Sequence, residues 1–292
     1  MAVEAYGSLD GDLRNDVRTL IKAVKVRDGA PPLSDHAMLQ LGVARPDLKH
    51  LVDRRAATIA GYAQLDGDTA EIADGDGDST AAVLLAALEE FAPHLIVWSH
   101  GKRSPVAPAA KARGYAKHRA LWQLRRPLTD LPDKPLPEGV TIRPFVPGQD
   151  EDAWLAVNAA AFADHAEQGR FTKDDIEARE AEPWFDPNGF LLAEGSLRPE
   201  HDSARGVEIL GFHWTKVHPH RIGEVYVLGI APQAQGLGLG PALLTAGLSY
   251  LAGQGLAEAM LYVDDSNTTA MELYRRYGFA RHDLDAQYSR PS

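Results

Sequence analysis

A glycine-rich loop lies between a strand pattern and a helix pattern, and its residue types could hold an anion. The strand pattern covers residues 225–231, and glycines follow at Gly236, Gly238 and Gly240. Glycines remove the side chains that would block a close approach, so successive backbone N–H groups can face a pyrophosphate at the positive end of the helix dipole. Pro241 is expected to be the first helical residue, because its fixed φ suits that position. The segment therefore predicts a pyrophosphate site.

Spacing separates this loop from two other phosphate-binding loops. A P-loop requires Lys and then Ser or Thr directly after its last glycine, whereas Pro241 and Ala242 stand there. A dinucleotide motif G-x-G-x-x-G that starts at Gly238 requires glycine where the chain has Leu243, and one that starts at Gly236 fails at Pro241. The pattern alone leaves a bare structural turn open.

The context of the loop resembles a known superfamily. The pattern Pro-x-x-Gln-x-x-Gly-x-Gly at residues 232–240 is similar to the acetyl-CoA pyrophosphate loop of GNAT acetyltransferases. Residues 261–267 and 277–279 resemble the next strand, the Asn-started helix and the closing Gly-Phe turn of that superfamily. The resemblance implies acetyl-CoA as the co-substrate and no metal. The residues implied to hold acetyl-CoA in the loop and at the start of the later helix are Gln235, Gly236, Leu237, Gly238, Leu239, Gly240 and Pro241, and Asn267, Thr268, Thr269, Ala270, Met271 and Glu272.

Further motifs narrow the resemblance to the mycothiol synthase family. They lie at residues 158–162, 165–169, 184–187, 211–219 and 223–227. Members of that family are tandem GNAT proteins that acetylate the cysteinyl amine of desacetylmycothiol, a Cys-glucosamine-inositol conjugate, in the last step of mycothiol biosynthesis. The resemblance implies an α/β fold (α+β mixed sheet) with two tandem GNAT-like domains, each a twisted mixed sheet flanked by helices.

Glu224 is the candidate general base. Strand alternation is expected to place it on the face of Tyr226 and Leu228, opposite Val225 and Val227. An apolar strand disfavours the charged form of a carboxylate, which suits a group that takes a proton from an ammonium. An exposed strand-end carboxylate or an ion-pair partner is the alternative that the pattern leaves open. The position matches the base of the family, which favours catalysis.

Tyr274 is the candidate general acid, in the place where GNAT enzymes commonly carry a tyrosine near the thioester sulfur. Its ordinary pKa of about 10 keeps it protonated at neutral pH, so it can donate to a thiolate whose conjugate acid has a pKa near 8.5. A core tyrosine is the alternative, and we expect that role for Tyr277. The oxyanion and the pantetheine arm are expected to meet the backbone N–H groups of Leu228, Gly229 and Ile230, where the glycine can open the strand.

The substrate contacts depend on the resemblance. Asp35, Glu167, Lys216 and Tyr262 match the substrate-binding positions of the family, beside Glu224 itself. Carboxylates accept hydrogen bonds from sugar hydroxyls, which makes these residue types suitable. Asp35 replaces a more usual glutamate in the half of the chain with the thinner similarity.

A proline-rich linker divides the chain. Four prolines alternate with charged residues between positions 127 and 139, which is typical of a semi-rigid connection. Each side ends with an aromatic glycine turn and a strand pattern, so we expect an internal duplication. Residues 1–137 are expected to form a degenerate, non-catalytic GNAT-like domain that helps form the substrate cleft, and residues 138–292 a catalytic GNAT N-acetyltransferase domain.

Residues 71–80 replace the glycine loop in the first half. Three aspartates there would repel a pyrophosphate. Their alternation from Asp74 is reminiscent of a calcium-binding EF-hand loop, but Ser79 and Leu85 stand where that loop requires glycine and glutamate. We therefore expect a solvated acidic turn that caps a helix from Ser79, and one acetyl-CoA site per chain.

Three histidines near one another in the sequence, His213, His218 and His220, raise the alternative of a metal site. Residues in a loop that contains Pro219 need not converge, and no carboxylate lies at ligand spacing. We expect no metal.

Composition bounds the other functions. The 292 residues, 45% of them hydrophobic, can supply two cores. No run of 18 apolar residues or basic N-terminal signal is present, and the chain has no cysteine, so we expect a cytoplasmic protein without a membrane partner. The net charge of −11 argues against a nucleic-acid partner and is compatible with a cationic amine.

We therefore expect a monomer that binds acetyl-CoA and a small thiol-sugar amine. A GNAT enzyme for another small amine or a protein N-terminus is the nearest alternative. A CoA-binding sensor without turnover is the alternative from another class.

Overall fold

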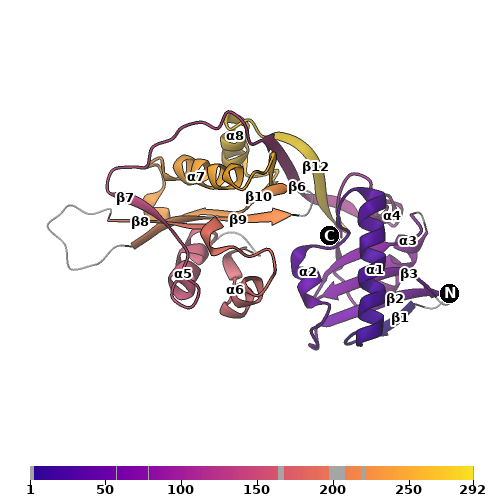
Figure 1. The fold of residues 1–292 in the computed structure, drawn as a ribbon. Helices are drawn as coiled ribbons and strands as arrows, with labels where there is room; N and C mark the ends of the chain where they lie inside the picture. The colour runs from indigo at the N-terminus through magenta and orange to yellow at the C-terminus, as the bar shows by residue number, and fades with distance from the viewer. Residues whose placement is uncertain are drawn as a thin grey trace. The chain divides into compact units, whose positions relative to one another are not determined.

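The computed structural model describes residues 3–56, 58–77, 79–163, 168–196, 208–218 and 221–291. The chain forms two compact units (Figure 1). Unit 1 comprises the residues up to Gln123 together with Asp264–Asn267 and the residues from His282 onward. Unit 2 comprises Leu124–Val263 and Thr268–Arg281.

Unit 1 is a mixed sheet flanked by helices. Its strands in chain order are β1 (Val3–Tyr6), β2 (Leu48–Arg55), β3 (Thr58–Asp66), β4 (Thr69–Asp74), β5 (Ile96–Ser99) and the last strand of the chain, β12 (Ala280–Ser289). Its helices are α1 (Gly11–Asp28), α2 (Asp35–Gln40), α3 (Thr80–Leu88) and α4 (Val106–Ala112). The spatial order is β1-β2-β3-β4-β5-β12, in which β4 and β5 run parallel and the other neighbours antiparallel.

Unit 2 repeats this order. Its strands are β7 (Val140–Pro144), β8 (Phe190–Gly195), β9 (Glu208–His218), β10 (Ile222–Ile230), β11 (Glu258–Asp264) and the end of β6 (Ala116–Pro127). Its helices are α5 (Glu151–Ala161), α6 (Lys173–Glu180), α7 (Leu239–Gly253) and α8 (Thr268–Arg276), with short 3-10 helices η1 (Gln168–Arg170), η2 (Pro187–Gly189) and η3 (Pro232–Ala234). The strands from β7 to β10 pair antiparallel, and β10 and β11 run parallel.

Each unit completes its sheet with a strand from the other half of the sequence. β12 pairs with β5 in unit 1, and in unit 2 Arg125 of β6 lies 3.1 Å from Glu258 of β11. The predicted fold class, two tandem mixed sheets flanked by helices, is confirmed. The compact units divide the chain after Gln123, and each also takes a segment from the other end of the sequence. Residue 137, the predicted boundary, lies within unit 2, and the division into two repeats there stays a prediction.

Local signals explain where the helices begin and end. Asp10 accepts from the N–H of Leu13 at 2.8 Å and so caps α1, and Gly29 ends that helix with φ of 81°. Thr172 and Asp175 form a capping box at the start of α6. These are short-range features, so the sequence specifies them directly.

The sheet of unit 2 is covered on both faces. Figure 1 shows α7 and α8 on one side of β9 and β10, with α5 and α6 on the other. On the α5 side, the ring of Trp154 meets Phe190, Phe212 and Trp214 edge to face at centroid distances of 5.5, 5.4 and 5.7 Å. Val227 of β10 packs in the same cluster, so these rings cover the α5 side of β10.

His213 and Gly247 fit against each other between β9 and α7. His213 is fully buried, and its Nδ1 donates to the carbonyl oxygen of Leu243 at 2.8 Å. Burial lowers the pKa of His213 to about 4, so the imidazole is neutral. A Cβ on Gly247 would collide with this ring.

We expect Gly247→Ala to destabilise the fold by roughly 1–3 kcal/mol, because an added methyl group overpacks the interface. Urea unfolding followed by tryptophan fluorescence measures this. Gly253→Ala is the matched control, since Gly253 ends the same helix and its Cβ would meet nothing within 4 Å. A control variant that loses as much stability as Gly247→Ala would contradict the packing argument.

Candidate active site

Strand β10 is irregular on both of its edges. A β-bulge interrupts its register with β9 between Val225 and Val227. Its parallel pairing with β11 is confined to Ile222–Glu224 opposite Glu258–Met260 among the described residues. Beyond Glu224 the two strands separate, which leaves main-chain groups of β10 open to a ligand.

The bulge changes which side chains share a face. Tyr226 and Val227 both pack in the aromatic cluster of the α5 side, whereas Leu228 and Ile230 pack in the apolar cluster of the α7 side. The expectation that Leu228 shares the face of Glu224, with Val227 opposite, is therefore wrong. The extra residue of the bulge shifts the alternation by one position.

Glu224 is buried on the α5 side, with 6% of its surface exposed. A Cβ on the preceding residue, Gly223, would meet Leu251 of α7, so Glu224 points to the opposite side. Lys216 is its direct partner on β9, and His218 Nε2 lies 2.5 Å from Glu224 Oε2. The sequence predicted apolar surroundings, but cross-strand neighbours make this environment polar.

Lys216 is held by aromatic rings. It is 5% exposed, and its ammonium lies 4.5 Å from the ring centroid of Trp184 and 5.2 Å from that of Tyr226. Arg179 of α6 donates to the hydroxyl oxygen of Tyr226 at 2.9 Å. Cation–π attraction to these rings offsets part of the cost of removing the ammonium from water. Sequence reasoning missed Arg179, for which no motif gives a signal, and it missed the roles of His218 and Tyr226.

Main-chain groups of β10 point to the open edge. Ala231 donates its N–H to the carbonyl of Leu210 on β9 at 2.9 Å, and the register continues without a shift back to Val227. Because antiparallel bonding alternates along a strand, the N–H of Gly229 also faces β9, while those of Leu228 and Ile230 face away from it. Of the three predicted amides, these two are oriented toward the opening.

The loop after β10 presents a run of amides. The N–H groups of the five residues from Gly236 to Gly240 have no hydrogen-bond acceptor within the described ranges of the chain. Gly238 has φ of 82°, a conformation that favours glycine, and a Cβ added at Gly240 would make only an ordinary contact with Ile230 at 3.7 Å. Such a run is a ready anion site at a helix N-terminus.

α7 begins two residues earlier than predicted. Gly238 is the N-cap and Leu239 the first helical residue, so Pro241 is the third and not the first. The N–H groups of the first turn have no intrahelical partner, and a proline is tolerated at its third position for that reason. Gln235 and Leu237 are exposed beside the loop, and Leu239 is buried in the core.

Tyr274 is buried and lies edge to face against Phe279, with ring centroids 5.7 Å apart. Its hydroxyl makes no hydrogen bond to any residue that the structure describes. Burial raises the pKa of Tyr274 to about 12, so the group is protonated at neutral pH. Tyr277 is also buried, and its hydroxyl donates to the carbonyl oxygen of Pro241 at 3.0 Å, which gives it the structural role expected from sequence.

The other residues predicted to hold acetyl-CoA lie at the start of α8. Asn267 precedes the helix and donates its N–H to the carbonyl of Asp264 at 3.0 Å. Thr268 and Thr269 are exposed, and Ala270, Met271 and Glu272 are partly buried. Glu272 accepts from Arg275 and Arg276, which hold its pKa near 2.

The remaining residues predicted to bind the substrate are Asp35, Glu167 and Tyr262. Asp35 is an exposed residue at the start of α2 in unit 1. Glu167 lies outside the described residues, as does His220. Tyr262 is on β11 of unit 2, partly buried.

A buried imidazolium anchors the start of α2 in unit 1. Ser34, the N-cap of α2, donates its hydroxyl to Glu71 at 2.7 Å. Glu71 in turn lies 3.0 Å from His100, whose other ring nitrogen is 3.0 Å from Asp285. Burial alone would lower the pKa of His100, but Asp285 and Glu71 outweigh it and raise that pKa to about 10.

In unit 1 an aspartate fills the position equivalent to the amide run. Asp74 is 1% exposed and accepts from the N–H groups of Asp76, Gly77 and Ala81 at 2.9, 2.7 and 2.7 Å. The turn is exposed at Gly75 and Asp76, as expected, but the expected cap by Ser79 is wrong, because Ser79 makes no side-chain cap and Asp74 accepts from the start of α3 instead. The carboxylate takes the donors that would otherwise face an anion.

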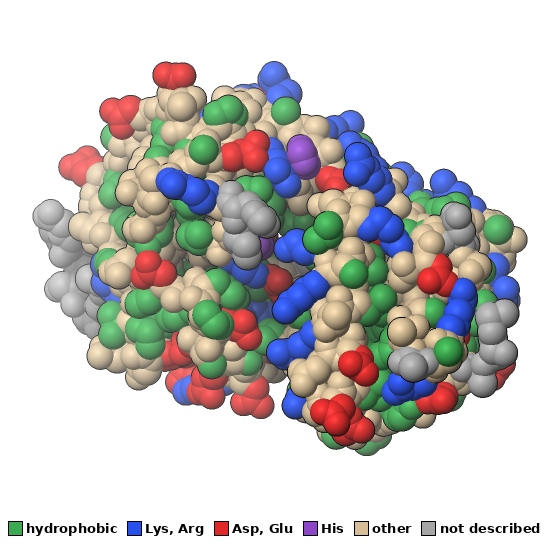
Figure 2. Space-filling model, turned by 45° about the vertical axis from the view of Figure 1, so that its right-hand side comes forward, with side chains coloured by type: hydrophobic (Ala, Val, Ile, Leu, Met, Phe, Trp, Pro, Cys, Tyr) green, Lys and Arg blue, Asp and Glu red, His purple; other side chains and the backbone are tan. Residues whose placement is uncertain are grey.

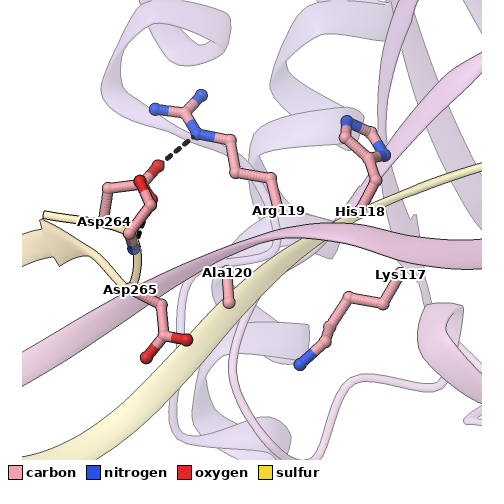
Figure 3. A pocket seen from close by; sticks show the side chains of 7 residues that line it. Lys117, His118, Arg119, Ala120, Asp264 and Asp265 are labelled. Carbon is pink, nitrogen blue, oxygen red and sulfur yellow. Dashed lines mark hydrogen bonds and ion pairs between the residues drawn. The ribbon is translucent and has the colours of Figure 1, made fainter.

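Two cavities accompany these features. One of about 480 Å³ in unit 1 is lined by Lys117, His118, Arg119, Ala120, Asp264, Asp265 and Ser266, and there Arg119 donates to Asp264 at 2.7 Å (Figure 3). One of about 190 Å³ in unit 2 is lined by Pro137, Glu138, Val140, Leu210, Ala234, Leu237 and Leu239. Only the second reaches the loop with the free amides.

Several global features follow from the described residues. Basic and acidic side chains are both present on the face drawn in Figure 2, so the charge of −11 is not gathered there into a single acidic field.

His213 lies on the α7 face of β9 and His218 on the opposite one, and the two cannot share an ion. The described ranges contain no cluster of metal-ligating side chains and no helix long and apolar enough to cross a membrane.

The bulged strand, the opening beside it and the amide run define the class of protein, an acetyltransferase of the GNAT superfamily. Residues 159–279 match the Acetyltransferase (GNAT) family. A GCN5-related N-acetyltransferase from Sphaerobacter thermophilus shares the fold at 23% identity, with a TM-score of 0.67 over 99% of this chain and 96% of that one. A tandem GNAT protein from the clavulanic acid biosynthesis pathway does so at 16% identity, with a TM-score of 0.69 over the whole of both chains.

The chain belongs to the mycothiol acetyltransferase family. It is 47% identical to the mycothiol acetyltransferase of Thermomonospora curvata, over 95% of this chain and 93% of that protein. It is 46% identical to that of Streptomyces coelicolor, over 98% and 94%, and 48% identical to that of Salinispora arenicola, over 94% and 92%. The predicted family and the predicted acyltransferase activity are confirmed.

Proposed function

We propose that the enzyme transfers the acetyl group of acetyl-CoA to the cysteinyl amine of desacetylmycothiol. The observation that carries this proposal is the buried Glu224, beside Lys216 and His218, on the strand that opens toward five free amides. The name of the relatives, mycothiol acetyltransferase, supports the substrate. The negative net charge suits an amine that arrives as an ammonium.

Acetyl-CoA is proposed to lie along the open edge of β10. The amides from Gly236 to Gly240 would hold its pyrophosphate, with the positive end of the α7 dipole behind them. The N–H of Leu228, which faces the opening, would hydrogen-bond the thioester oxygen and stabilise the oxyanion of the tetrahedral adduct. The pantetheine arm would then bond to Ile230 as an added strand would.

The proposed chemistry uses one acceptor and one donor. Glu224 takes a proton from the amine, which attacks the thioester carbon, and Tyr274 donates to the sulfur as the C–S bond breaks. Lys216, Tyr262, Glu167 and Asp35 are proposed to bind the hydroxyl-rich part of the substrate, with Lys216 supplying a fixed cation beside the base.

Turnover with the purified enzyme tests this function. Because the acceptor itself carries a thiol, the N-acetylated product is followed by mass spectrometry and not by thiol release. Acetylation of the conjugate at a kcat/KM far above those for an aminoglycoside and an N-terminal peptide supports the proposal. Preference for either alternative acceptor overturns the substrate, and CoA binding without turnover on any amine favours the sensor.

We expect one acetyl-CoA to bind per chain, because Asp74 already occupies the amide donors in unit 1. Titration calorimetry should give a stoichiometry near one for wild type. Leu237→Asp, which places a carboxylate beside the amide run of unit 2, should weaken that binding by about tenfold or more. A second equivalent in wild type, or a site insensitive to this change, would contradict the assignment.

A further inference from the structure

Acetyl transfer to an ammonium must release one proton for each turnover. The nitrogen begins with three hydrogens and keeps one in the amide, so it loses two protons. The leaving thiolate gains one, so a net proton has to reach solvent. A base that takes both protons from the nitrogen in turn must release the first proton before it takes the second, and the second before the next turnover.

Glu224 is poorly placed to exchange this proton directly. Its side chain is only 8% exposed, and a bound substrate would cover it further. His218 offers an exit, because its Nε2 lies 2.5 Å from Glu224 Oε2 and its side chain is 22% exposed. No residue that the structure describes hydrogen-bonds the second ring nitrogen, Nδ1. An imidazole with one nitrogen on the base and the other free to meet water has the form of a proton shuttle.

We propose that His218 is a positioning residue that relays the proton from Glu224 to solvent. This inference deepens the proposed function and rests on it. In the first step an N–H bond of the ammonium breaks and an O–H bond forms on Glu224. Nε2 of His218 then takes that proton while Nδ1 gives its own to water, which returns the carboxylate to its charged form. The cycle repeats for the second proton, after the C–N bond has formed. Tyr274, which has given its proton to the sulfur, regains one from solvent, so the two relayed protons amount to a net release of one.

The strand geometry supports a relay over a chance contact. Lys216 and His218 lie two residues apart on β9 and so share the face of Glu224. Lys216, engaged by Trp184 and Tyr226, bears no free acceptor and cannot take a proton while charged. His218 is therefore the neighbour of Glu224 in this part of β9 that can both accept and donate.

The test compares His218→Gln and His218→Ala with wild type under saturating acetyl-CoA. Glutamine can still donate to Glu224 but cannot pass a proton on, so the relay predicts a fall in kcat of about tenfold or more for both variants. KM for acetyl-CoA should stay unchanged, since the amide run is untouched. Added imidazole should restore a large part of kcat in His218→Ala. His94→Gln, at an exposed position in unit 1, is the control for general histidine loss.

The outcomes separate the two proposals. Full activity in His218→Gln, or loss in His218→Ala that imidazole does not rescue, overturns the relay and leaves a structural contact. If wild type acetylates a different amine, the substrate proposal fails and the same series with that amine still decides the relay. If wild type acetylates no amine, both proposals fall.

Discussion

Replacing Glu224 with glutamine should lower kcat by about 10²- to 10⁴-fold, the usual loss when a general base is removed. Glutamine preserves the size of the side chain and its contact with His218 but cannot hold the proton of an ammonium. KM for acetyl-CoA should change little, because Glu224 lies outside the run of amides from Gly236 to Gly240. Steady-state kinetics with each substrate varied in turn measures both constants.

The pH dependence of this loss gives a second check. An α-amino group has a reference pKa of about 8, so above that pH the substrate loses its proton to solvent without help. The deficit of Glu224→Gln should therefore shrink as pH rises from 7 to about 9. Glu208→Gln, at an exposed position on β9, is the matched control and should behave as wild type. A deficit that is constant over this range would assign Glu224 to binding.

The amide run could be read from sequence because its determinants are local. A loop that presents N–H groups needs glycine, and Gly238 proves to hold φ of 82°. The helix that supplies the dipole begins directly after Gly238, so one short motif contains both the amides and the helix N-terminus. The predicted start of α7 at Pro241 is two residues late, because the sequence pattern does not show that Gly238, by adopting that conformation, caps the helix.

The surroundings of Glu224 could not be read in the same way. The bulge at Tyr226 depends on how β10 pairs with β9, and alternation counted along one strand misses it. The contact of His218 with Glu224 depends on the register of β9 against β10, and that of Arg179 with Tyr226 depends on how α6 packs against the sheet. The sequence pattern specifies neither. Pairing across strands and packing between helices decide these neighbours.

The first half of the chain shows the same limit. Its aspartates are expected to repel an anion from a solvated turn, and the structure leaves Asp76 exposed but buries Asp74 as an internal acceptor for three amides. Residue types alone predicted the loss of anion binding but not its cause. The carboxylate reaches N–H groups up to seven residues away, a geometry set by the way the turn folds back on itself.

Replacing Tyr274 with phenylalanine should lower kcat by about 10²-fold and leave the fold intact. The ring keeps its packing against Phe279, and no described residue depends on the hydroxyl for a hydrogen bond. Tyr277→Phe is a control of opposite character, since its hydroxyl donates to Pro241. It should cost about 0.5–1.5 kcal/mol of stability and leave kcat nearly unchanged. Kinetics and urea unfolding of both variants test this crossed pattern.

Acyl donors whose leaving thiols differ in acidity test whether Tyr274 donates its proton to the sulfur. A pKa of about 12 keeps its hydroxyl protonated, so its donation should persist as pH rises and fail only as pH approaches 12. Burial favours the neutral form in the folded state, so its share of stability is likewise present below pH 10 and lost through about 12. An acyl donor whose thiol is more acidic than that of CoA needs less help to depart, and the deficit of Tyr274→Phe should shrink with it. An equal deficit for both donors would remove the tyrosine from the breaking of the C–S bond and leave it as a packing residue.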